Sequence, residues 1–271
     1  MQKRALCAVL CLCLMFGISG YAAAAESDVK LVVNDVALDA EVAVQVCNQT
    51  TYVSYWPVVQ ALYPNATATW EVDRAVVRAP GLEMSICPGE SYLQANGRYL
   101  WVSDGFKMQN GVVLVPIRVL GQALGASVTW DGTTGSVVIR SGSGPISSGS
   151  EFYQDDVVYW LSRIINAESG NQPLSGKIAV GNVVLNRVAS PRFPNTVYEV
   201  IFQRNQFTPT INGSIYRTPN AESVVAAKLC LEGVNTAGNS LYFVNPRVSP
   251  NSWAQRNRPY VATIGAHAFF A

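Results

Sequence analysis

The chain has 271 residues, of which 49% are hydrophobic and 14% are charged, and its formal net charge is +1. A high apolar fraction with so few charges excludes an intrinsically disordered chain. The length is sufficient for one or two domains with separate cores, and the near-neutral charge gives no reason to expect nucleic-acid binding. The single histidine excludes any metal site or catalytic triad that needs two.

The first 25 residues have the pattern of a secretory signal peptide. Lys3 and Arg4 form a short basic start, residues 5–18 are an apolar run, and small residues precede a cleavage position after Ala25. The run is shorter than the roughly 18–20 apolar residues that a spanning helix needs. We therefore expect cleavage, a secreted mature chain and no membrane span after it, with an uncleaved anchor as the alternative.

A Gly/Ser-rich stretch with one proline, residues 141–150, separates two halves of the mature chain. This composition cannot bury enough surface to order itself and predicts a flexible linker. We therefore expect residues 26–140 and residues 151–271 to form separate domains.

The mature chain keeps three cysteines, Cys47, Cys87 and Cys230. An odd number leaves one thiol over in an exported protein. Cys47 and Cys87 lie in the same half and are either a disulfide pair or two buried free thiols, because the sequence does not supply the geometry that a disulfide requires.

The first half contains an internal repeat. Residues 51–62 match residues 113–124, and each copy leads to a tryptophan, Trp70 or Trp130, followed by an apolar strand. We expect each copy to form a strand, a short helix and a hairpin, which makes this half a small β-rich domain. Because glycine tolerates positive φ, three Asn-Gly or Asp-Gly pairs predict hairpin turns. They are Asn96-Gly97, Asn110-Gly111 and Asp131-Gly132.

Residues 115–131, in the second copy, resemble the copper amine oxidase N-terminal-like domain, and the resemblance extends over about residues 29–140. That family is common as a spacer or stalk in exported proteins of Gram-positive bacteria. The resemblance implies a stalk over residues 26–140 that contacts the cell wall or a partner protein. This half has no histidine, so imidazole ligation of copper is impossible, and its scattered acidic side chains are expected to be solvated. No metal or cofactor is expected.

In the second half, an amphipathic helix is predicted to start at an N-cap of Asp155 or Asp156 and to run to about Ala167. Its apolar stripe continues at Glu168, four residues after Ile164. Partial burial and the negative end of the helix dipole both disfavour a carboxylate there, which raises its pKa. A glutamic acid kept protonated near neutral pH can be the general acid of glycoside cleavage. The alternative is a helix-terminal glutamate that bends to water.

Several motifs in this half occur in the order of one known family. They are Asn-Ala-Glu-Ser-Gly around Glu168, Leu-Asn-Arg-Val-Ala-Ser-Pro at 185–191, Leu-Tyr-Phe-Val-Asn-Pro at 241–246 and Gly-Ala-His-Ala-Phe-Phe at 265–270. They resemble the cell-wall hydrolase family of spore-cortex-lytic enzymes, the SleB and CwlJ type, over nearly all of residues 157–271. The resemblance implies a mainly helical, lysozyme-like or lytic-transglycosylase-like catalytic domain over residues 151–271, with Glu168 as the catalytic acid. The implied substrate is the peptidoglycan glycan strand. The sequence leaves open whether this strand belongs to the spore cortex or to the vegetative wall, and whether the protein acts in germination.

The remaining carboxylates favour a mechanism with one acid. After Glu168 the sequence contains no aspartate and three glutamates, which we expect to be solvated: Glu199, Glu222 and Glu232. A retaining or inverting glycosidase normally needs a second carboxylate. In a lytic transglycosylase the muramyl 6-hydroxyl attacks C1 instead, and Glu168 serves first as acid and then as base. We therefore favour lytic cleavage between N-acetylmuramic acid and N-acetylglucosamine over a hydrolytic muramidase or glucosaminidase.

Four further residues are candidates for substrate contact. Gln206 and Phe207 follow a predicted helix, where Gln206 can hydrogen-bond an N-acetyl or hydroxyl group and Phe207 can stack on a sugar face. Tyr242 and Asn245 lie on a short strand that runs into a turn, and the family resemblance places this segment near the cleft. Ordinary packing or turn formation is the alternative for each of the four.

Two other classes of function compete with this interpretation. A cysteine peptidase or amidase would use Cys230 and His267, but Cys230 lies in an apolar run where a core thiol is expected. A zinc amidase needs several histidines and is excluded. A non-catalytic wall-binding protein would keep the aromatic cleft without a working acid.

Overall fold

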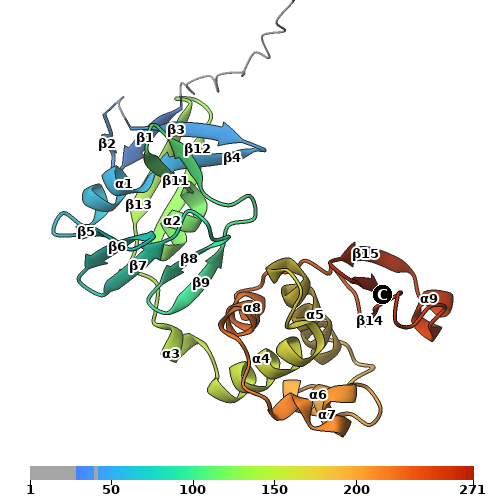
Figure 1. Ribbon diagram of the computed structural model, residues 1–271. Coiled ribbons are helices and arrows are strands. Elements are labelled where there is room, and N and C mark those ends of the chain that lie inside the picture. Colours follow the sequence, from blue (N-terminus) through green and yellow to red (C-terminus); the bar gives the residue numbers. More distant parts are fainter. Residues whose placement is uncertain (1–28, 40–41) are drawn as a thin grey trace, which may run out of the picture.

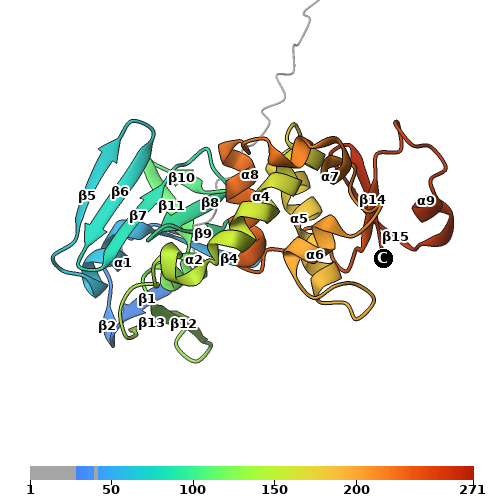
Figure 2. The same ribbon diagram turned by 90° about the horizontal axis from the view of Figure 1, so that it is seen from below.

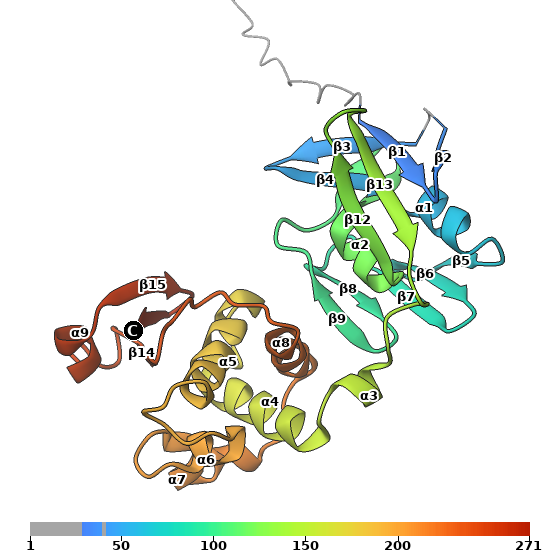
Figure 3. The ribbon, with the colours of Figure 1, turned by 180° about the vertical axis from the view of Figure 1, so that it is seen from behind.

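The structure, a computed structural model, describes residues 29–39 and 42–271, so the predicted signal peptide lies outside the described residues. Strands predominate before Ser141 and helices after Gly149, which makes this a mixed α+β protein (Figure 1). The two parts lie side by side in all three views (Figure 2, Figure 3). Within the described ranges, no helix has both the length and the apolar character needed to span a membrane.

The described strands of the N-terminal part form three sheets around one core of buried, mainly aliphatic side chains. The first sheet has the order β12 (Ala126–Asp131), β13 (Ser136–Ser141), β1 (Lys30–Val33) and β2 (Val36–Ala37). The second has the order β10 (Lys107–Gln109), β11 (Val112–Pro116), β4 (Thr50–Ser54) and β3 (Val44–Cys47). The third is the meander β5 (Thr67–Glu71), β6 (Arg74–Ala79), β7 (Leu82–Ile86), β8 (Tyr92–Ala95) and β9 (Arg98–Trp101).

Both copies of the repeat contain a strand, a helix and a hairpin. In the first copy β4 leads into α1 (Tyr55–Leu62) and the β5–β6 hairpin, and in the second β11 leads into α2 (Ile117–Ala123) and the β12–β13 hairpin. β4 and β11 pair in antiparallel fashion with Val53 opposite Val115, and these two valines are equivalent positions of the repeat. Because equivalent residues face each other, a local two-fold axis relates the two copies at this strand pair.

Two of the three predicted turns have the expected geometry. Residues 96–97 and 110–111 are two-residue turns in which both residues have positive φ. The third prediction is wrong in detail, because the β12–β13 turn contains four residues and its positive φ lies at Gly135 rather than Gly132. The Asp131 carboxylate accepts hydrogen bonds within this turn, which explains why a longer turn is stable.

Cys47 and Cys87 are free thiols in the structure. Of the two alternatives that the sequence left open, the disulfide is therefore not formed. Cys87 Sγ donates to Asp73 Oδ2 at 3.6 Å. Cys230 is buried in the core of the C-terminal part.

The C-terminal part packs helices around a second core and ends in a small sheet. Its helices are α3 (Gly149–Phe152), α4 (Asp155–Ser169), α5 (Leu174–Val188), α6 (Val197–Phe202), α7 (Thr208–Asn212), α8 (Ala221–Leu231), α9 (Trp253–Asn257) and the 3₁₀ helix η1 (Ser214–Tyr216). The sheet has the order β14 (Tyr242–Val244), β16 (His267–Phe270) and β15 (Tyr260–Ile264). Leu161, Ile164 and Ile165 of α4 are fully buried, so the predicted apolar stripe faces the core.

The predicted N-cap of α4 is wrong by one residue. Gln154 is the N-cap, without a side-chain bond, and Asp155 and Asp156 lie in the first turn. Their charges there stabilise the positive end of the helix dipole instead of capping a backbone N–H. At the other end, α4 extends past Ala167 to Ser169, which places Glu168 inside its last turn.

Residues 141–150 are held in place, contrary to the flexible linker that their composition predicts. Ile146 N donates to the Ala123 carbonyl at 3.2 Å, and Ile146 packs against the N-terminal core. Asn96 Nδ2 donates to the Ile146 carbonyl at 2.8 Å, while Gly149 N donates to the Asn96 carbonyl at 2.7 Å. The stretch is ordered by partners from the β8–β9 turn and α2, which local composition cannot reveal.

A buried ion pair joins the two parts, with the β8–β9 hairpin lying beside α8 (Figure 1). Arg98 Nε and Nη2 donate to the two carboxylate oxygens of Glu232 at 2.8 and 2.6 Å, and Tyr153 Oη donates to the same carboxylate at 2.6 Å. The side chains of Arg98 and Glu232 are only 10% and 4% exposed. The expectation that Glu232 is a solvated helix end is therefore wrong, because its partner comes from the other half of the chain.

Aromatic side chains surround this ion pair. Tyr92, Tyr99 and Trp101 of the β8–β9 hairpin pack against the core of the C-terminal part. The Lys228 ammonium lies 5.2 Å from the Tyr99 ring and 5.1 Å from the Tyr153 ring. The apolar contacts exclude water from the ion pair, and together they hold the two parts as one unit.

Replacing Glu232 is expected to weaken the whole molecule. Glu232→Gln leaves the buried Arg98 guanidinium without a countercharge, which should lower the free energy of unfolding by about 3 kcal/mol. Urea unfolding measures this change. The control is Arg140→Gln, which breaks an exposed ion pair with Asp35 and should change the free energy of unfolding far less than Glu232→Gln does. Equal effects of the two substitutions would contradict the role of the buried pair.

Candidate active site

The end of α4 that carries Glu168 is tied to α8 through asparagine side chains. Asn220 N donates to Asn166 Oδ1 at 3.0 Å, and Asn220 Nδ2 donates to the Gly170 carbonyl at 3.1 Å. Asn220 Oδ1 also accepts from Ser223 N at 2.8 Å, which caps α8. One residue thus fixes the C-terminus of α4 and starts α8, so that the Glu168 backbone has a defined position.

Glu168 opens onto a pocket of about 540 Å³. The structure brings all the sequence-predicted site residues into its lining: Glu168, Gln206, Phe207, Tyr242 and Asn245. They come from the end of α4, the segment before α7, and β14 with the turn that follows it. Residues separated by more than 70 positions in the sequence therefore share one site.

The four candidate contact residues differ in what they offer to this pocket. Gln206 is exposed. Tyr242 lies on β14 and is half-buried. Asn245 Oδ1 accepts from Arg247 N at 3.0 Å, so its oxygen serves the turn, as the alternative interpretation expected. Phe207 is only 3% exposed and belongs to the helical core. At this low exposure the ring offers little surface for the predicted stacking on a sugar face, although Phe207 is part of the pocket lining.

The Glu168 carboxyl is half-buried and has no hydrogen-bond partner within residues 29–39 and 42–271. Burial raises the pKa of this carboxyl to about 7, because its charged form loses hydration without gaining a donor. Near neutral pH both protonation states are populated. Glu168 can therefore donate a proton and then accept one.

The other glutamates of the C-terminal part are absent from the pocket lining. Glu199 is exposed and accepts from Thr196 Oγ1 at 2.9 Å beside the start of α6. Glu222 is paired with Lys177, and Glu232 belongs to the ion pair with Arg98. Among the residues that the structure describes, no cluster of histidine, cysteine and carboxylate side chains could hold a metal ion.

Arg187 is a pocket residue that the sequence analysis did not select. It lies on α5, is 5% exposed, and donates from Nε to the Leu241 carbonyl at 2.8 Å. Its buried Nη1 has no partner in the described part of the chain. The guanidinium lies about 5 Å from the Phe193 and Phe207 rings, and burial lowers its pKa to about 10. A buried cation with an unused donor is costly to maintain, which marks it as a candidate for ligand contact.

His267 and Trp253 also line the pocket. His267 is 7% exposed, its buried Nδ1 has no partner among the described residues, and burial lowers its pKa, so it is neutral near pH 7. Trp253 is 51% exposed and its ring lies 5.5 Å from that of Tyr242. Only the neighbouring capping box of α9, Ser252 with Gln255, signals this segment in the sequence, and it does not indicate a pocket.

The geometry does not fit a cysteine nucleophile. Cys230 is buried in the helical core, donates from Sγ to the Ile178 carbonyl at 3.3 Å and does not line the pocket that contains His267. Burial raises the pKa of its thiol far above neutrality, so no thiolate forms at pH 7.

Comparison with known proteins agrees with both resemblances. Residues 171–270 match the family described as Cell Wall Hydrolase, and residues 32–139 match the Copper amine oxidase N-terminal domain. The chain is 31% identical over 120 residues to the cell wall hydrolase CwlJ of Oceanobacillus iheyensis. The aligned segment covers 41% of this chain and 83% of that protein. The chain belongs to the cell wall hydrolase family.

Two further relatives are similar over the same part of the chain. The spore cortex-lytic enzyme of Bacillus cereus is 38% identical over 117 residues, which cover 43% of this chain and 45% of that enzyme. This chain thus spans less than half the length of the curated spore enzyme. The crystal structure of the catalytic domain of Bacillus cereus SleB is 37% identical and covers 44% of this chain and 92% of that domain, with a TM-score of 0.41. The Cell Wall Hydrolase match begins three residues after Glu168.

The raised pKa of Glu168 predicts a pH-dependent stability. Between about pH 4.5 and pH 7 the folded chain keeps a proton that the unfolded chain releases, so the free energy of unfolding falls as pH rises through this window. The loss should be on the order of 3 kcal/mol. Glu168→Gln has no proton to release and should become more stable than wild type at about pH 8.

Urea unfolding at about pH 5 and about pH 8 measures this difference. Glu199→Gln, at an exposed glutamate, is the matched control and should follow the wild-type pH dependence. Parallel curves for Glu168→Gln and wild type would show that the buried carboxyl does not titrate in this range.

Proposed function

We propose that this protein cleaves the glycan strand of peptidoglycan as a lytic transglycosylase, with Glu168 as general acid and base. The observation that carries the proposal is the one carboxyl in the described lining of the pocket, whose pKa is raised to about 7. Such a group can be protonated at the start of a reaction and ionised halfway through it.

The proposed reaction needs no water and no second side-chain carboxylate. Glu168 donates its proton to the glycosidic oxygen between N-acetylmuramic acid and N-acetylglucosamine as the bond from that oxygen to C1 breaks. The resulting Glu168 carboxylate then takes the proton of the muramyl 6-hydroxyl, whose oxygen bonds to C1. The products are a 1,6-anhydromuramyl end and a free 4-hydroxyl on N-acetylglucosamine, and Glu168 regains its proton. The nucleophile is intramolecular, so proximity replaces a second catalytic group.

A hydrolytic muramidase or glucosaminidase is the less favoured form of the same activity. Hydrolysis with retention or inversion normally uses a second carboxylate within about 5–9.5 Å of the first. Glu199, Glu222 and Glu232 do not line the pocket, and the last two are paired with Lys177 and Arg98. A non-catalytic wall-binding protein would not need a buried carboxyl with a pKa near neutrality.

The pocket offers donors and an aromatic wall for the sugars. Arg187 Nη1, which has no partner among the described residues, can donate to a sugar or acetamido oxygen, and exposed Gln206 can bond an acetamido group at the rim. Tyr242 and Trp253 form an edge-to-face pair in the lining, which suits the apolar faces of sugar rings better than Phe207 does.

Family relatives suggest where the substrate occurs. The spore cortex-lytic enzymes of Bacillus cereus and Bacillus subtilis are 38% and 32% identical to this chain over 117 residues. We propose that the mature protein is secreted, is associated with the cell wall or spore, and acts on cortex or vegetative peptidoglycan during germination or growth.

Digestion of purified peptidoglycan tests the activity. We expect mass spectra of the wild-type digest to show muropeptides with anhydro ends, one water lighter than reducing ends. Glu168→Gln should lose cleavage by at least about 10²-fold and still bind the wall, whereas Glu199→Gln should keep the wild-type rate. Reducing ends would instead show a hydrolase, free peptides an amidase, and no fragments a wall-binding protein. A wild-type rate for Glu168→Gln would refute the assignment of the acid.

A further inference from the structure

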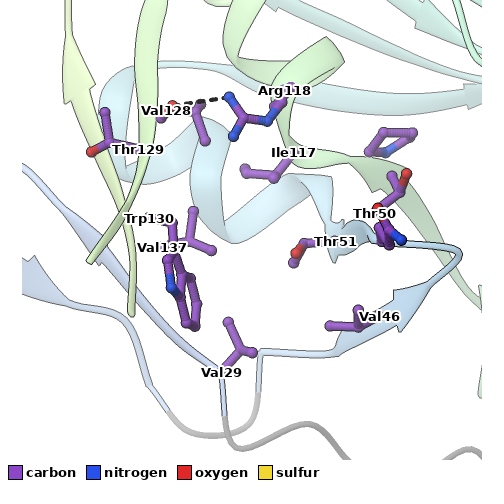
Figure 4. Close-up of a pocket in the computed structure, with 12 residues that line it drawn as sticks. Val29, Val46, Thr50, Thr51, Ile117, Arg118, Val128, Thr129, Trp130 and Val137 are labelled. Atoms are coloured by element: carbon purple, nitrogen blue, oxygen red, sulfur yellow. Dashed lines mark hydrogen bonds between the residues drawn. The ribbon is translucent and has the colours of Figure 1, made fainter. Parts of the chain in front are cut away.

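Two pockets of the N-terminal part lie at equivalent positions of the internal repeat. The Trp130 pocket, about 430 Å³, is formed by residues 116–118 at the start of α2, Trp130 on β12, and Thr50 and Thr51 on β4 (Figure 4). The Trp70 pocket, about 1150 Å³, is formed by residues 54–56 at the start of α1, Trp70 on β5, and Val112 and Val113 on β11.

The correspondence between the two pockets follows from the two-fold relation. Pro116 pairs with Tyr52 and Leu114 with Ser54, so the β4–β11 pair has one pocket at each end. Each pocket combines the helix start and the tryptophan of one copy with the first strand residues of the other copy. One architecture thus produces the same kind of pocket twice, which suits a ligand that is itself repetitive.

Both tryptophans are exposed although each borders a pocket. Trp130 is 54% exposed and Trp70 is 58% exposed. In Figure 4 the Trp130 indole lies beside Val29 and Val137, with Thr50 and Thr51 across the pocket. An indole face opposite hydroxyl groups matches a sugar ring, which has C–H faces and hydroxyl edges.

The charge of the N-terminal part argues for a neutral ligand. Residues 26–149 contain 7 basic and 11 acidic side chains, a net charge of −4, which disfavours an anionic wall polymer. Of the residues that line the pockets, Arg118 in the Trp130 pocket and Asp39 in the Trp70 pocket are the charged ones. The other polar lining groups are hydroxyls and amides, such as Gln49 and Gln60.

We propose that each of these two pockets binds a run of sugars in the uncharged glycan backbone of the cell wall. This rests on the proposed function, because it assigns the same polymer to both parts of the chain. A two-fold axis reverses the direction of a bound strand, so each pocket takes its own strand segment. Two weak sites on one molecule then act together on the multi-stranded wall, although each is weak on a short oligosaccharide.

The buried pair Arg98–Glu232 links wall binding in the two pockets to the position of Glu168. Because the N-terminal part is fixed to the helical part, a wall strand held at Trp130 or Trp70 keeps Glu168 at a set distance from the wall. Binding through a flexible linker would not fix this distance.

The test measures binding of the full chain to wall sacculi from which anionic polymers have been removed. All variants are made in a Glu168→Gln parent, so that cleavage does not consume the ligand. If this parent still releases wall fragments, the proposed role of Glu168 fails, and this result is separate from the binding measurement. Trp130→Ala and Trp70→Ala should each weaken binding about tenfold, and the double variant about a hundredfold. Thermal unfolding should be unchanged, because both tryptophans are exposed.

The matched control is Met108→Ala, a 54% exposed residue of β10 outside both pockets, which should bind like the parent. Parent-like binding by the double tryptophan variant would overturn the proposal, and so would an equal loss in Met108→Ala. Binding that disappears when anionic polymers are stripped from the wall would also overturn it, because the ligand would then be the anionic polymer.

Discussion

A carboxyl group that loses hydration without gaining a hydrogen-bond donor is costly, and Glu168 is such a group: it is half-buried and has no partner among the residues that the structure describes. Glu168 stands on the apolar side of α4 in continuation of Leu161, Ile164 and Ile165, so the packing that stabilises the helix also half-buries the carboxyl. Asn220 ties the end of α4 to the start of α8 and prevents the last turn from fraying into solvent. The raised pKa of about 7 is the electrostatic result of this packing.

A second buried glutamate shows the opposite solution. Glu232, at the end of α8, receives two donors from Arg98 and a third from Tyr153. A glutamate whose carboxylate accepts several hydrogen bonds, Glu232, thus joins two parts of the chain. Glu168, whose carboxyl has no such donors among the described residues, is the candidate acid. The difference lies in the partners that the fold supplies, and these come from residues more than 70 positions away in the sequence.

Much of this arrangement could be predicted from local pattern. The spacing of apolar residues in α4, the glutamate on that stripe, the two-copy repeat and the Asn-Gly turns are local features. The placing of Tyr242 and Asn245 near Glu168 came from the family resemblance, and both residues line the Glu168 pocket. Features that depend on tertiary contacts could not be predicted: the ordered stretch at 141–150 and the burial of Phe207 and Glu232. Arg187 becomes noticeable only when the fold leaves its Nη1 buried with no partner in the described ranges, and the place of His267 in the pocket likewise depends on the fold.

In the proposed reaction one carboxyl, that of Glu168, performs both proton transfers. The pH dependence of kcat/KM on peptidoglycan tests it most directly, because this profile reports the essential ionisations of the free enzyme. We expect a single essential ionisation: kcat/KM should not vary at acid pH and should fall as pH rises through about 7. A bell-shaped profile with an additional carboxylate that must be ionised near pH 4 would contradict it, because it would require a second catalytic carboxylate.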